Sequence, residues 1–336
     1  MAIARSKGQQ SEGLELYSRD QHIEMYRMML LIRRFEEMCG KMYQQAEIGG
    51  FCHLYIGQEA VCVGIQSALR PDDYVMGTYR EHGQCLAAGS NPKAIMAELF
   101  GRDTGICRGK GGSMHLFDKE RNFMGGTAIV GGNLPIAAGV GWAIKYRGSD
   151  QVCVCYFGDG AINEGAFHEA LNMAGLWKLP VLFVCENNLY GMGTQVTRAS
   201  AVPDLSRRVS GYGVESANVD GMDLMAIRKL AETAINECRN GRGPYFIEAK
   251  PYRYRGHSMA DPATYRTKDE VEEWRVRDPI GRYEHLLLKA EIISDEDVQK
   301  ISTDIDSIVE ESVKFAEESP FPSPDALYEH VYAEEI

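Results

Sequence analysis

The sequence predicts an α/β fold in which a parallel sheet carries helices on both faces, with further helices at both ends of the chain. Between about residues 50 and 260, short apolar segments alternate with helical patterns. Strands that alternate with helices are joined by crossovers, which make them parallel neighbours in one sheet. We find no linker that would divide the chain. We therefore expect an N-terminal arm (1–17) and a single domain (18–336), with its core at about 50–260 and a C-terminal helical region at about 268–336.

The individual elements follow from the spacing of apolar residues. A long N-terminal helix is expected at about residues 18–46, where Ser18 and Gln21 are placed to form a capping box. From residue 268 to 317 the chain is charged and has a helical pattern, and a proline-rich segment follows. The expected strands are 73–76, 152–157, 181–185, 214–219 and 245–249, and the clearest helices between them are 167–177 and 224–238.

The composition argues against two kinds of partner. The 336 residues carry a formal net charge of −12, and a nucleic-acid partner would require a basic surface. The longest weakly polar run, residues 134–144, is interrupted by Pro135 and is too short to span a membrane. We therefore expect neither a nucleic-acid nor a membrane partner.

The cysteines and the first residues bear on the compartment. None of the nine cysteines forms a Cys-x-x-Cys pair, so neither a zinc ribbon nor a redox motif is predicted. Scattered thiols suit a reducing compartment, and the N-terminus has no apolar core of a secretory signal. We expect a cytoplasmic protein. The mitochondrial matrix is the less favoured alternative, because the N-terminus does not resemble a clear transit peptide.

Polar side chains follow the predicted strands at their carboxyl ends, where open parallel sheets bind ligands. A Gly-Asp-Gly motif (158–160) follows the second strand, and Asn187 and Asn188 follow the third after 26 residues (161–186). One helix and one strand fit this interval, which places Asp159 and Asn188 at neighbouring strand ends. Asp159 alone could be a turn residue. With the two asparagines at this spacing, the oxygen ligands instead favour a Mg²⁺ site that includes phosphate and water.

These motifs carry a resemblance to a known family. The Gly-Asp-Gly and Asn-Asn pair, in a strand–loop–helix–strand setting, resembles the thiamine diphosphate-binding motif. Further segments resemble α subunits of the decarboxylating components of 2-oxo acid dehydrogenase complexes, and the pyruvate dehydrogenase family is the most similar. The resemblance implies the thiamine diphosphate-binding α/β fold, in the half that binds the diphosphate and Mg²⁺. The segments are residues 50–60, 109–115, 186–193 and 252–259, and the similarity extends from about 20 to 330.

The resemblance implies a set of metal and phosphate contacts. Asp159, Asn188 and the backbone carbonyl of Tyr190 match the Mg²⁺ ligands of the family. Gly160 and Ala161 match backbone donors to the diphosphate, at the start of the helix that follows the motif.

Other matched positions contact the cofactor from separate loops. Tyr79 and Arg80 match residues that bind the diphosphate, and the planar fork of Arg suits phosphate. The alternative for Arg80 is a surface ion pair with Glu81. Ala128 and Val130 match backbone contacts to the aminopyrimidine and its neighbourhood, although relatives often carry Gly at the position of Ala128.

Two histidines match the active-site histidines of the family. These are His53 and His257, and His257 also matches a cofactor contact. An imidazole with a pKa near neutrality suits proton transfer to a substrate oxygen. The alternative is that each histidine is an ordinary core residue with satisfied hydrogen bonds. His82 and His115 lie in the shared segments, and we expect them to make structural hydrogen bonds.

The activity implied by the resemblance is the oxidative decarboxylation of pyruvate. The acetyl group would pass to the lipoyl group on the lipoyl domain of a dihydrolipoyl acetyltransferase component. A carboxylate that activates thiamine diphosphate is missing, because Glu59, the only candidate in a shared segment, is expected to be structural. In the family a β subunit supplies this glutamate, so an α₂β₂ heterotetramer is implied. The alternatives are a chain that serves acetoin or a branched-chain 2-oxo acid, and a noncatalytic scaffold that binds Mg²⁺ and a diphosphate.

Overall fold

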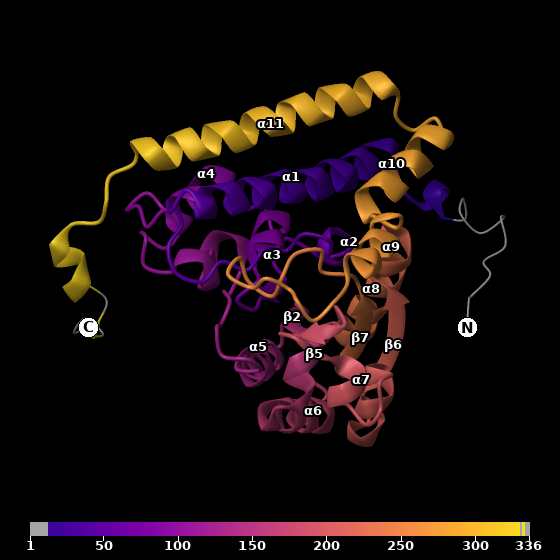
Figure 1. Ribbon diagram of the computed structural model, residues 1–336. Coiled ribbons are helices and arrows are strands. Elements are labelled where there is room, and N and C mark those ends of the chain that lie inside the picture. The colour runs from indigo at the N-terminus through magenta and orange to yellow at the C-terminus, as the bar shows by residue number, and fades with distance from the viewer. Residues whose placement is uncertain (1–12, 330, 333–336) are drawn as a thin grey trace.

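The computed structural model describes residues 13–329, 331 and 332. Most of the predicted N-terminal arm (1–17) lies outside these residues, and its described part contains the short 3-10 helix η1 (Leu14–Leu16). The described chain forms a central sheet with helices on both faces, and a long C-terminal helix lies across one side (Figure 1).

The sheet has five parallel strands in the order β1-β2-β3-β7-β6. Each strand begins and ends within one residue of a predicted strand, so the predicted α/β fold with a parallel sheet is confirmed. The last strand of the chain lies between β3 and β6, an order that the sequence did not predict. In chain order the strands are β1 (Tyr74–Met76), β2 (Cys153–Gly158), β3 (Val181–Glu186), β6 (Glu215–Asp220) and β7 (Tyr245–Lys250).

Alternate residues of the strands enter two separate apolar cores. In β2, Val154 and Tyr156 belong to one core, whereas Cys153, Cys155 and Phe157 belong to the other. Burial on both faces explains why the parallel strands are continuous apolar runs in the sequence. The first core includes α1 (Arg19–Gln44), α2 (Glu59–Gln66) and α8 (Leu224–Arg239), and the second includes α5 (Asn133–Arg147), α6 (Gly165–Trp177) and η5 (Leu205–Tyr212).

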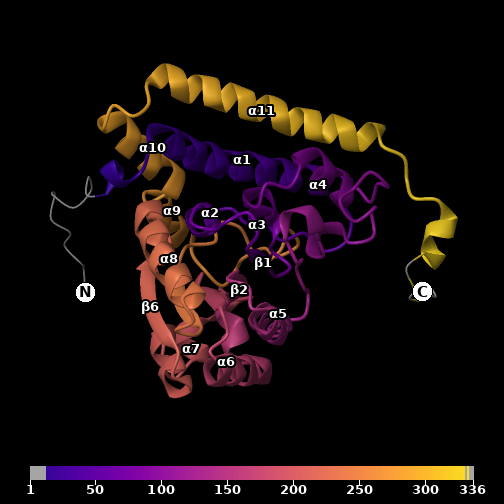
Figure 2. The same cartoon turned by 180° about the vertical axis from the view of Figure 1, so that it is seen from behind.

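The long N-terminal helix α1 begins with the predicted capping box. The Ser18 side chain accepts a hydrogen bond from the backbone N–H of Gln21, and the Gln21 side chain accepts one from the N–H of Ser18. The C-terminal helix α11 (Asp295–Glu318) lies along α1 in both views of the ribbon (Figures 1 and 2). The two ends of the described chain therefore build one helical layer beside the first core.

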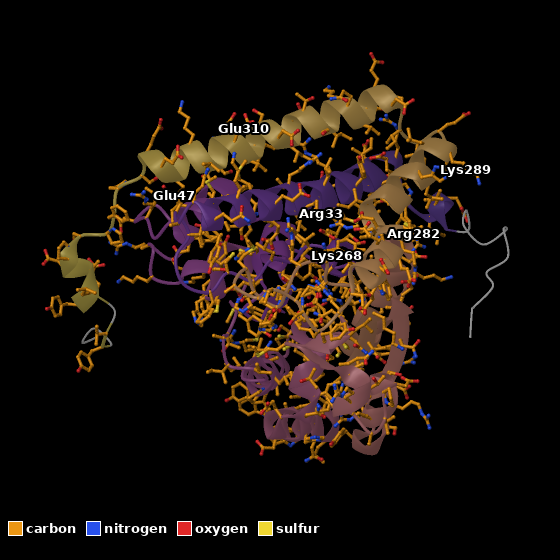
Figure 3. All side chains as sticks on the ribbon, viewed as in Figure 1. Arg33, Glu47, Lys268, Arg282, Lys289 and Glu310 are labelled. Carbon is orange, nitrogen blue, oxygen red and sulfur yellow. The ribbon has the colours of Figure 1, made fainter. Side chains whose placement is uncertain are left out.

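The charged region after residue 268 is helical, as predicted. It forms α9 (Lys268–Arg275), α10 (Pro279–Lys289) and α11. Charged side chains such as Lys289 and Glu310 lie on the exposed surfaces of these helices (Figure 3).

The remaining elements are short and connect the sheet to its helical layers. Among the described residues, none of the helices combines the length and the apolar character that crossing a membrane requires. These short elements are α3 (His82–Ala87), α4 (Pro92–Leu99), α7 (Val196–Ala199), η2 (Gly112–Met114), η3 (Lys119–Arg121), η4 (Asp159–Asn163), η6 (Pro324–Tyr328) and the hairpin of β4 (Tyr190–Gly191) and β5 (Thr194–Gln195).

Candidate functional site

The three groups expected to bind a metal lie close together at the carboxyl edge of the sheet. β2 and β3 are neighbours and pair Gly158 with Glu186, so Asp159 and Asn188 follow directly at adjacent strand ends. The hairpin that follows β3 turns back over this edge. A β-carbon built on Gly191 would lie 3.8 Å from Asp159 Oδ2 and 3.5 Å from the α-carbon of Gly160. The Asp159 carboxylate therefore lies beside Gly191, the residue directly after Tyr190.

Arg253 shows that these oxygens face a common point. Its guanidinium Nη1 donates hydrogen bonds to Asn188 Oδ1 at 3.3 Å and to the carbonyl of Tyr190 at 3.1 Å. The other terminal nitrogen donates to the carbonyl of Met192 at 3.2 Å. Two of the three expected metal ligands are therefore already oriented towards a positive group. Oxygen donors of this kind, with a carboxylate beside them, suit Mg²⁺, so the residues present fit the expected ion.

Burial favours the neutral form of the Asp159 carboxyl group. The residue is only 4% exposed, and burial raises the pKa of its carboxyl group to about 6, although the positive charge of Arg253 acts in the opposite direction. A divalent cation at this position would lower that pKa further and stabilise the ionised form. The sequence analysis did not single out Arg253, although it lies in the Tyr-Arg-Tyr-Arg run of the segment 252–259.

The expected phosphate donors lie in the first turn of η4. Gly160 and Ala161 follow Asp159 directly, where the first N–H groups of a helix have no partner within that helix. The tip of the β4–β5 hairpin packs against this turn, because a β-carbon on Gly160 would lie 3.7 Å from the α-carbon of Gly191. A β-carbon at either position would make ordinary van der Waals contact across this junction, so the turn and the hairpin lie directly against each other.

The two predicted histidines form one cluster with Tyr79. The ring centroids of His53 and Tyr79 are 4.5 Å apart, those of His53 and His257 are 5.1 Å apart, and those of Tyr79 and His257 are 5.5 Å apart. The Nδ1 atoms of both histidines are buried and have no hydrogen-bond partner among the described residues. Because buried polar atoms are normally paired, these two nitrogens are available for a ligand.

Both imidazoles are neutral at physiological pH, which differs from the near-neutral pKa expected from the sequence. Burial lowers the pKa of His53 to about 3 and that of His257 to about 4, and the positive charge of Arg80 lowers both further. A neutral imidazole has one N–H donor and one acceptor nitrogen. The histidines can therefore form hydrogen bonds with a substrate without carrying charge in the free chain.

Arg80 is a buried residue of the site and not the surface ion pair with Glu81 that was the alternative. It is 4% exposed and donates to the carbonyls of Leu54 and His257 at 2.7 and 2.6 Å. Glu81 is buried elsewhere and accepts a hydrogen bond from the N–H of Leu116. Burial, and the charge of Arg253, lower the pKa of Arg80 to about 10, so it remains a cation at neutral pH.

Ala128 and Val130 lie at an open rim of the site rather than in its buried part. They belong to the loop before α5, in which Val130 is 44% exposed and Ile129 is 73% exposed. A β-carbon on Gly131 would lie 3.3 Å from Cβ of Glu164, so the loop runs beside the segment that follows η4. The loop therefore lies beside the 3-10 turn that begins with Asp159.

His82 and Glu59 have structural roles, as expected. His82 Nδ1 lies 2.9 Å from Glu36 Oε2, and its Nε2 lies 2.8 Å from Ser113 Oγ. Glu59 forms an ion pair with Arg33 at 2.6 Å. His115 Nδ1 also lies 3.3 Å from the carbonyl of Gly126, in agreement with its expected structural role.

The structure also brings together a second group of potential metal ligands. The ligand atoms of Glu36, Cys39 and His82 lie within 4.8 Å of one another. Both oxygens of Glu36 already accept hydrogen bonds, one from the N–H of Tyr55 and one from His82. We interpret this group as a hydrogen-bond network that joins α1 to α3.

A buried carboxyl group that was not predicted from the sequence, Glu186, lies at the end of β3 beside the proposed metal ligands. Glu186 ends β3, accepts hydrogen bonds from Tyr55 and Gln84, and has a pKa that burial raises to about 7. Its position directly before Asn187 and Asn188 was visible in the sequence, but its burial depends on α3 and the loop before α2.

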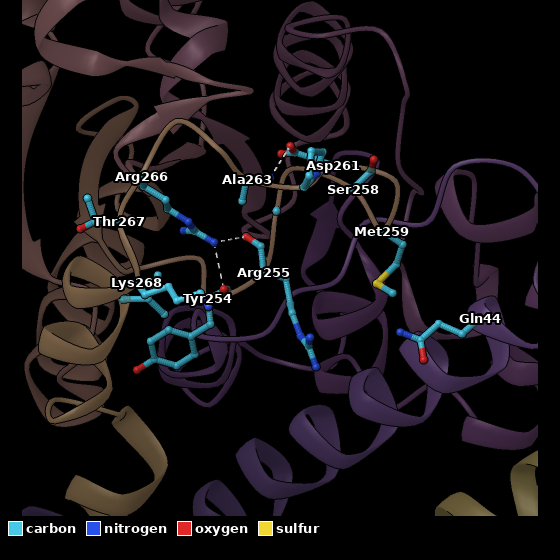
Figure 4. A pocket seen from close by; sticks show the side chains of 13 residues that line it. Gln44, Tyr254, Arg255, Ser258, Met259, Asp261, Ala263, Arg266, Thr267 and Lys268 are labelled. Carbon is cyan, nitrogen blue, oxygen red and sulfur yellow. Dashed lines mark hydrogen bonds between the residues drawn. The ribbon is translucent and has the colours of Figure 1, made fainter.

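The loop after β7 carries His257 and is held by its own charged residues. Arg266 donates to the backbone carbonyls of Arg253, Tyr254 and Arg255. Asp261 accepts hydrogen bonds from the N–H of His257 at 2.6 Å. The outer side of this loop borders a pocket of about 350 Å³, into which Arg255 projects (Figure 4).

Comparisons with known proteins agree with this geometry. The model of the family described as "Dehydrogenase E1 component" matches residues 26–325. The chain is 49% identical over 313 residues to the pyruvate dehydrogenase E1 component subunit alpha of Rhizobium meliloti, covering 93% of this chain and 90% of that protein. It is 49% identical over 315 residues to the protein of the same name from Zymomonas mobilis, covering 93% and 89%.

A human relative extends the similarity beyond these organisms. The chain is 44% identical over 318 residues to the testis-specific mitochondrial form of the pyruvate dehydrogenase E1 component subunit alpha of Homo sapiens, covering 94% of this chain and 81% of that protein. The family match spans the sheet, the second apolar core, all of the first core except Leu14 and Met25, and all the residues of the candidate site. The chain therefore belongs to the dehydrogenase E1 component family.

Proposed function

We propose that this chain is the α subunit of the decarboxylating component of a pyruvate dehydrogenase complex. The observation that carries the proposal is the convergence of Asp159, Asn188 and the Tyr190 carbonyl at one edge of the sheet. The relatives from Rhizobium meliloti and Zymomonas mobilis, both named as pyruvate dehydrogenase E1 α subunits, support the choice of pyruvate.

In this proposal the chain holds Mg²⁺ and thiamine diphosphate through separate groups. Asp159, Asn188 and the Tyr190 carbonyl hold the ion, and Tyr79 and Arg80 bind the diphosphate. The backbone of Gly160 and Ala161 and of the loop with Ala128 and Val130 completes the contacts. Thiamine diphosphate, when bound, supplies the nucleophilic carbon and the electron sink that decarboxylation of a 2-oxo acid requires. Arg253 keeps the metal ligands oriented by donating to two of them.

The histidine cluster positions pyruvate and its protons. His53 and His257 present unpartnered Nδ1 atoms beside the Tyr79 ring. Because both imidazoles are neutral, each can donate one hydrogen bond to the keto oxygen or carboxylate of pyruvate and accept another. An anion bound against them would raise their pKa towards the range in which they transfer protons.

A β subunit is proposed to cover the apolar surface of α5 and α6. These helices pack against each other below the sheet (Figures 1 and 2). Trp142 is 49% exposed and stacks on Tyr146, which is 79% exposed, with ring centroids 5.2 Å apart. Neighbouring exposed apolar side chains of this kind are typical of an interaction surface on a folded chain. Further exposed apolar residues continue from the cofactor loop to the end of α6, at Ile129, Ile136, Leu176 and Trp177.

The continuity of this surface with the site explains why a partner is needed. The loop with Ala128 and Val130 leads directly into α5, so a subunit on α5 would also cover the rim of the site. We propose an α₂β₂ heterotetramer in which the β subunit supplies the activating glutamate. The lipoyl domain of the acetyltransferase component then receives the acetyl group at the loop that carries His257.

We further propose a cytoplasmic location. The nine cysteines are all unpaired thiols, which suits a reducing compartment. The relatives from Rhizobium meliloti and Zymomonas mobilis are consistent with this location.

A substrate assay on the assembled enzyme tests the function. The chain is co-expressed with its β partner, and turnover is compared for pyruvate, acetoin and 3-methyl-2-oxobutanoate with Mg²⁺ and thiamine diphosphate. Pyruvate is expected to turn over fastest, and an Asp159→Ala tetramer is expected to be inactive. Equal or faster turnover of either competitor would assign the chain to an acetoin or branched-chain enzyme. Purification without a second chain of similar size would favour the noncatalytic scaffold.

A further inference from the structure

Glu270 links the β4–β5 hairpin, which carries the proposed metal ligand Tyr190, to helix α9. It lies in the first turn of α9, and its carboxylate accepts hydrogen bonds from the hydroxyl of Tyr190 at 3.1 and 3.0 Å. It also accepts one from the hydroxyl of Tyr252 at 2.9 Å. Among the described residues Glu270 forms no ion pair, so these two tyrosines account for its hydrogen bonds through the side chain.

The backbone around Tyr190 is strained and must be held by its surroundings. Leu189 and Met192 have left-handed φ values of 75° and 51° and flank the Tyr190–Gly191 dipeptide on both sides. A residue other than glycine in this conformation costs roughly 1–3 kcal/mol and persists only where neighbouring groups enforce it. The hairpin has only two pairs of residues between its strands, Tyr190 with Gln195 and Gly191 with Thr194. Its own pairing therefore gives the strained backbone little support.

The side chain of Tyr190 is the attachment point through which this strained loop is held. Its ring packs against Tyr265, with centroids 5.2 Å apart, and its hydroxyl reaches Glu270. The carbonyl of the same residue faces the guanidinium of Arg253. One residue therefore connects the candidate metal position to α9, because the ring fixes the backbone that presents the carbonyl.

Helix α9 is itself anchored to the segment after β7, so Glu270 is a rigid attachment. The rings of Tyr252 and Trp274 stack with centroids 5.0 Å apart and an interplanar angle of 5°. The Tyr254 hydroxyl donates to the carbonyl of Trp274 at 3.2 Å. Movement of α9 would break these contacts together with the bond to Tyr190.

We infer that Glu270 is a positioning residue for the metal: through the Tyr190 hydroxyl it holds the Tyr190 carbonyl in the orientation that a divalent cation requires. The inference rests on the proposed function, because it assumes that this carbonyl is a Mg²⁺ ligand. Removing a group that orients a metal ligand typically weakens metal binding by roughly 10- to 100-fold.

The test is a calorimetric titration of Mg²⁺ into the metal-free α₂β₂ complex in the presence of one fixed concentration of thiamine diphosphate, the same for every variant. Glu270→Ala and Tyr190→Phe are each expected to raise the apparent dissociation constant for Mg²⁺ about tenfold. The double variant is expected to show about the same tenfold loss rather than about a hundredfold, because both changes remove one interaction.

Two matched variants separate positioning from charge and from general packing. Glu270→Gln keeps an acceptor oxygen without the charge and is expected to stay within about threefold of the wild type. Tyr252→Phe removes the other hydroxyl bound to Glu270. Its apparent dissociation constant for Mg²⁺ is also expected to stay within about threefold of the wild-type value. Thermal unfolding of each cofactor-free complex shows whether the variant is folded. If Glu270→Ala does not assemble, Tyr190→Phe carries the test, because it leaves Glu270 in place.

Several outcomes would overturn the inference. Wild-type Mg²⁺ affinity in Tyr190→Phe, additive losses in the double variant, or a loss in Glu270→Gln as large as that in Glu270→Ala would each show that Glu270 does not act through Tyr190. A wild-type complex that binds thiamine diphosphate without any dependence on Mg²⁺ would instead contradict the proposed function.

Discussion

At the scale of single residues, the site is built from polar groups whose burial determines their protonation. Asp159 and Glu186 have raised pKa values because burial disfavours their charged forms. His53 and His257 have lowered pKa values for the same reason, with Arg80 adding to the effect. Burial thus favours the neutral form of each of these four groups, and a bound cation or anion beside them would shift these pKa values back towards their ordinary range.

The lowered histidine pKa values predict a specific dependence of stability on pH. Below the ordinary pKa of about 6.5 the unfolded chain binds protons that the folded chain does not, so this contribution is fully present above about pH 6.5 and is lost as the pH falls towards 4. Replacing His53 with Asn removes one such group. The fall in melting temperature of the cofactor-free complex between pH 7 and pH 5 should then be smaller by roughly 2–4 °C, the shift that about 2 kcal/mol produces in a chain of this size.

The exposed His285 on α10 provides the control for this measurement. His285→Asn is expected to leave the acid-induced fall unchanged. Carboxyl groups with a raised pKa, such as Glu186, make the folded state more stable as the pH falls. This effect is the same in the wild type, His53→Asn and His285→Asn, so it does not alter the comparison. An identical fall in wild type and His53→Asn would contradict the low pKa of His53.

At the scale of elements, close contacts between helices determine how the sheet is covered. α2 and α8 approach each other through Gly64, where a β-carbon would lie 2.8 Å from Cγ2 of Ile227 and 3.3 Å from the N atom of Arg228. Gly281, in the exposed first turn of α10, has no atom within 4 Å of the same built position. Two helical glycines therefore have opposite roles, one forming a contact and one leaving open space.

This difference predicts opposite effects of the same substitution. Gly64→Ala should destabilise the protein by roughly 1–3 kcal/mol, because the added methyl group must displace Ile227 or separate the two helices. Gly281→Ala should stabilise it by roughly 0.5–1 kcal/mol, because alanine restricts the unfolded chain and no neighbour is displaced. Melting temperatures of the two variants would show shifts of opposite sign. A neutral Gly64→Ala would mean that α2 and α8 are less closely packed than described.

At the scale of the whole molecule, the chain is a folded unit whose candidate site borders exposed apolar residues. The proposed metal ligands and both histidines belong to this chain, whereas the loop before α5 leads from the candidate site onto the exposed apolar residues of α5 and α6. Glu59, the one carboxylate of the shared segments that was considered as an activator, is committed to its ion pair with Arg33. These features together are those of one subunit in a larger enzyme.

A charge placed on the α5 surface tests this view. Trp142→Glu should abolish co-purification with the β subunit, because it buries an unpaired carboxylate in an apolar interface, while circular dichroism of the chain stays unchanged. Leu16→Asp, at another exposed apolar residue far from α5 in the sequence, is the control and should assemble normally. Size-exclusion chromatography with light scattering distinguishes the tetramer from the free chain. Normal assembly of Trp142→Glu would place the partner elsewhere.

The sequence by itself determined the strands, the long capped helix and the placement of the proposed metal ligands at neighbouring strand ends. These features are local: apolar runs predict buried strands, Ser18 and Gln21 satisfy the first N–H groups of α1, and Asp159 and Asn188 sit directly after two consecutive strands. Each depends on residues that are close in the chain, so spacing alone was sufficient to predict it.

Only the tertiary structure decided how distant segments meet at the site. The insertion of β7 between β3 and β6 brings the loop with Arg253 and His257 to the metal edge, and α9 then delivers Glu270 to Tyr190. The low pKa of the histidines likewise depends on burial by several segments. Long-range packing and desolvation leave no local pattern in the sequence, because they arise from residues that become neighbours only when the chain has folded.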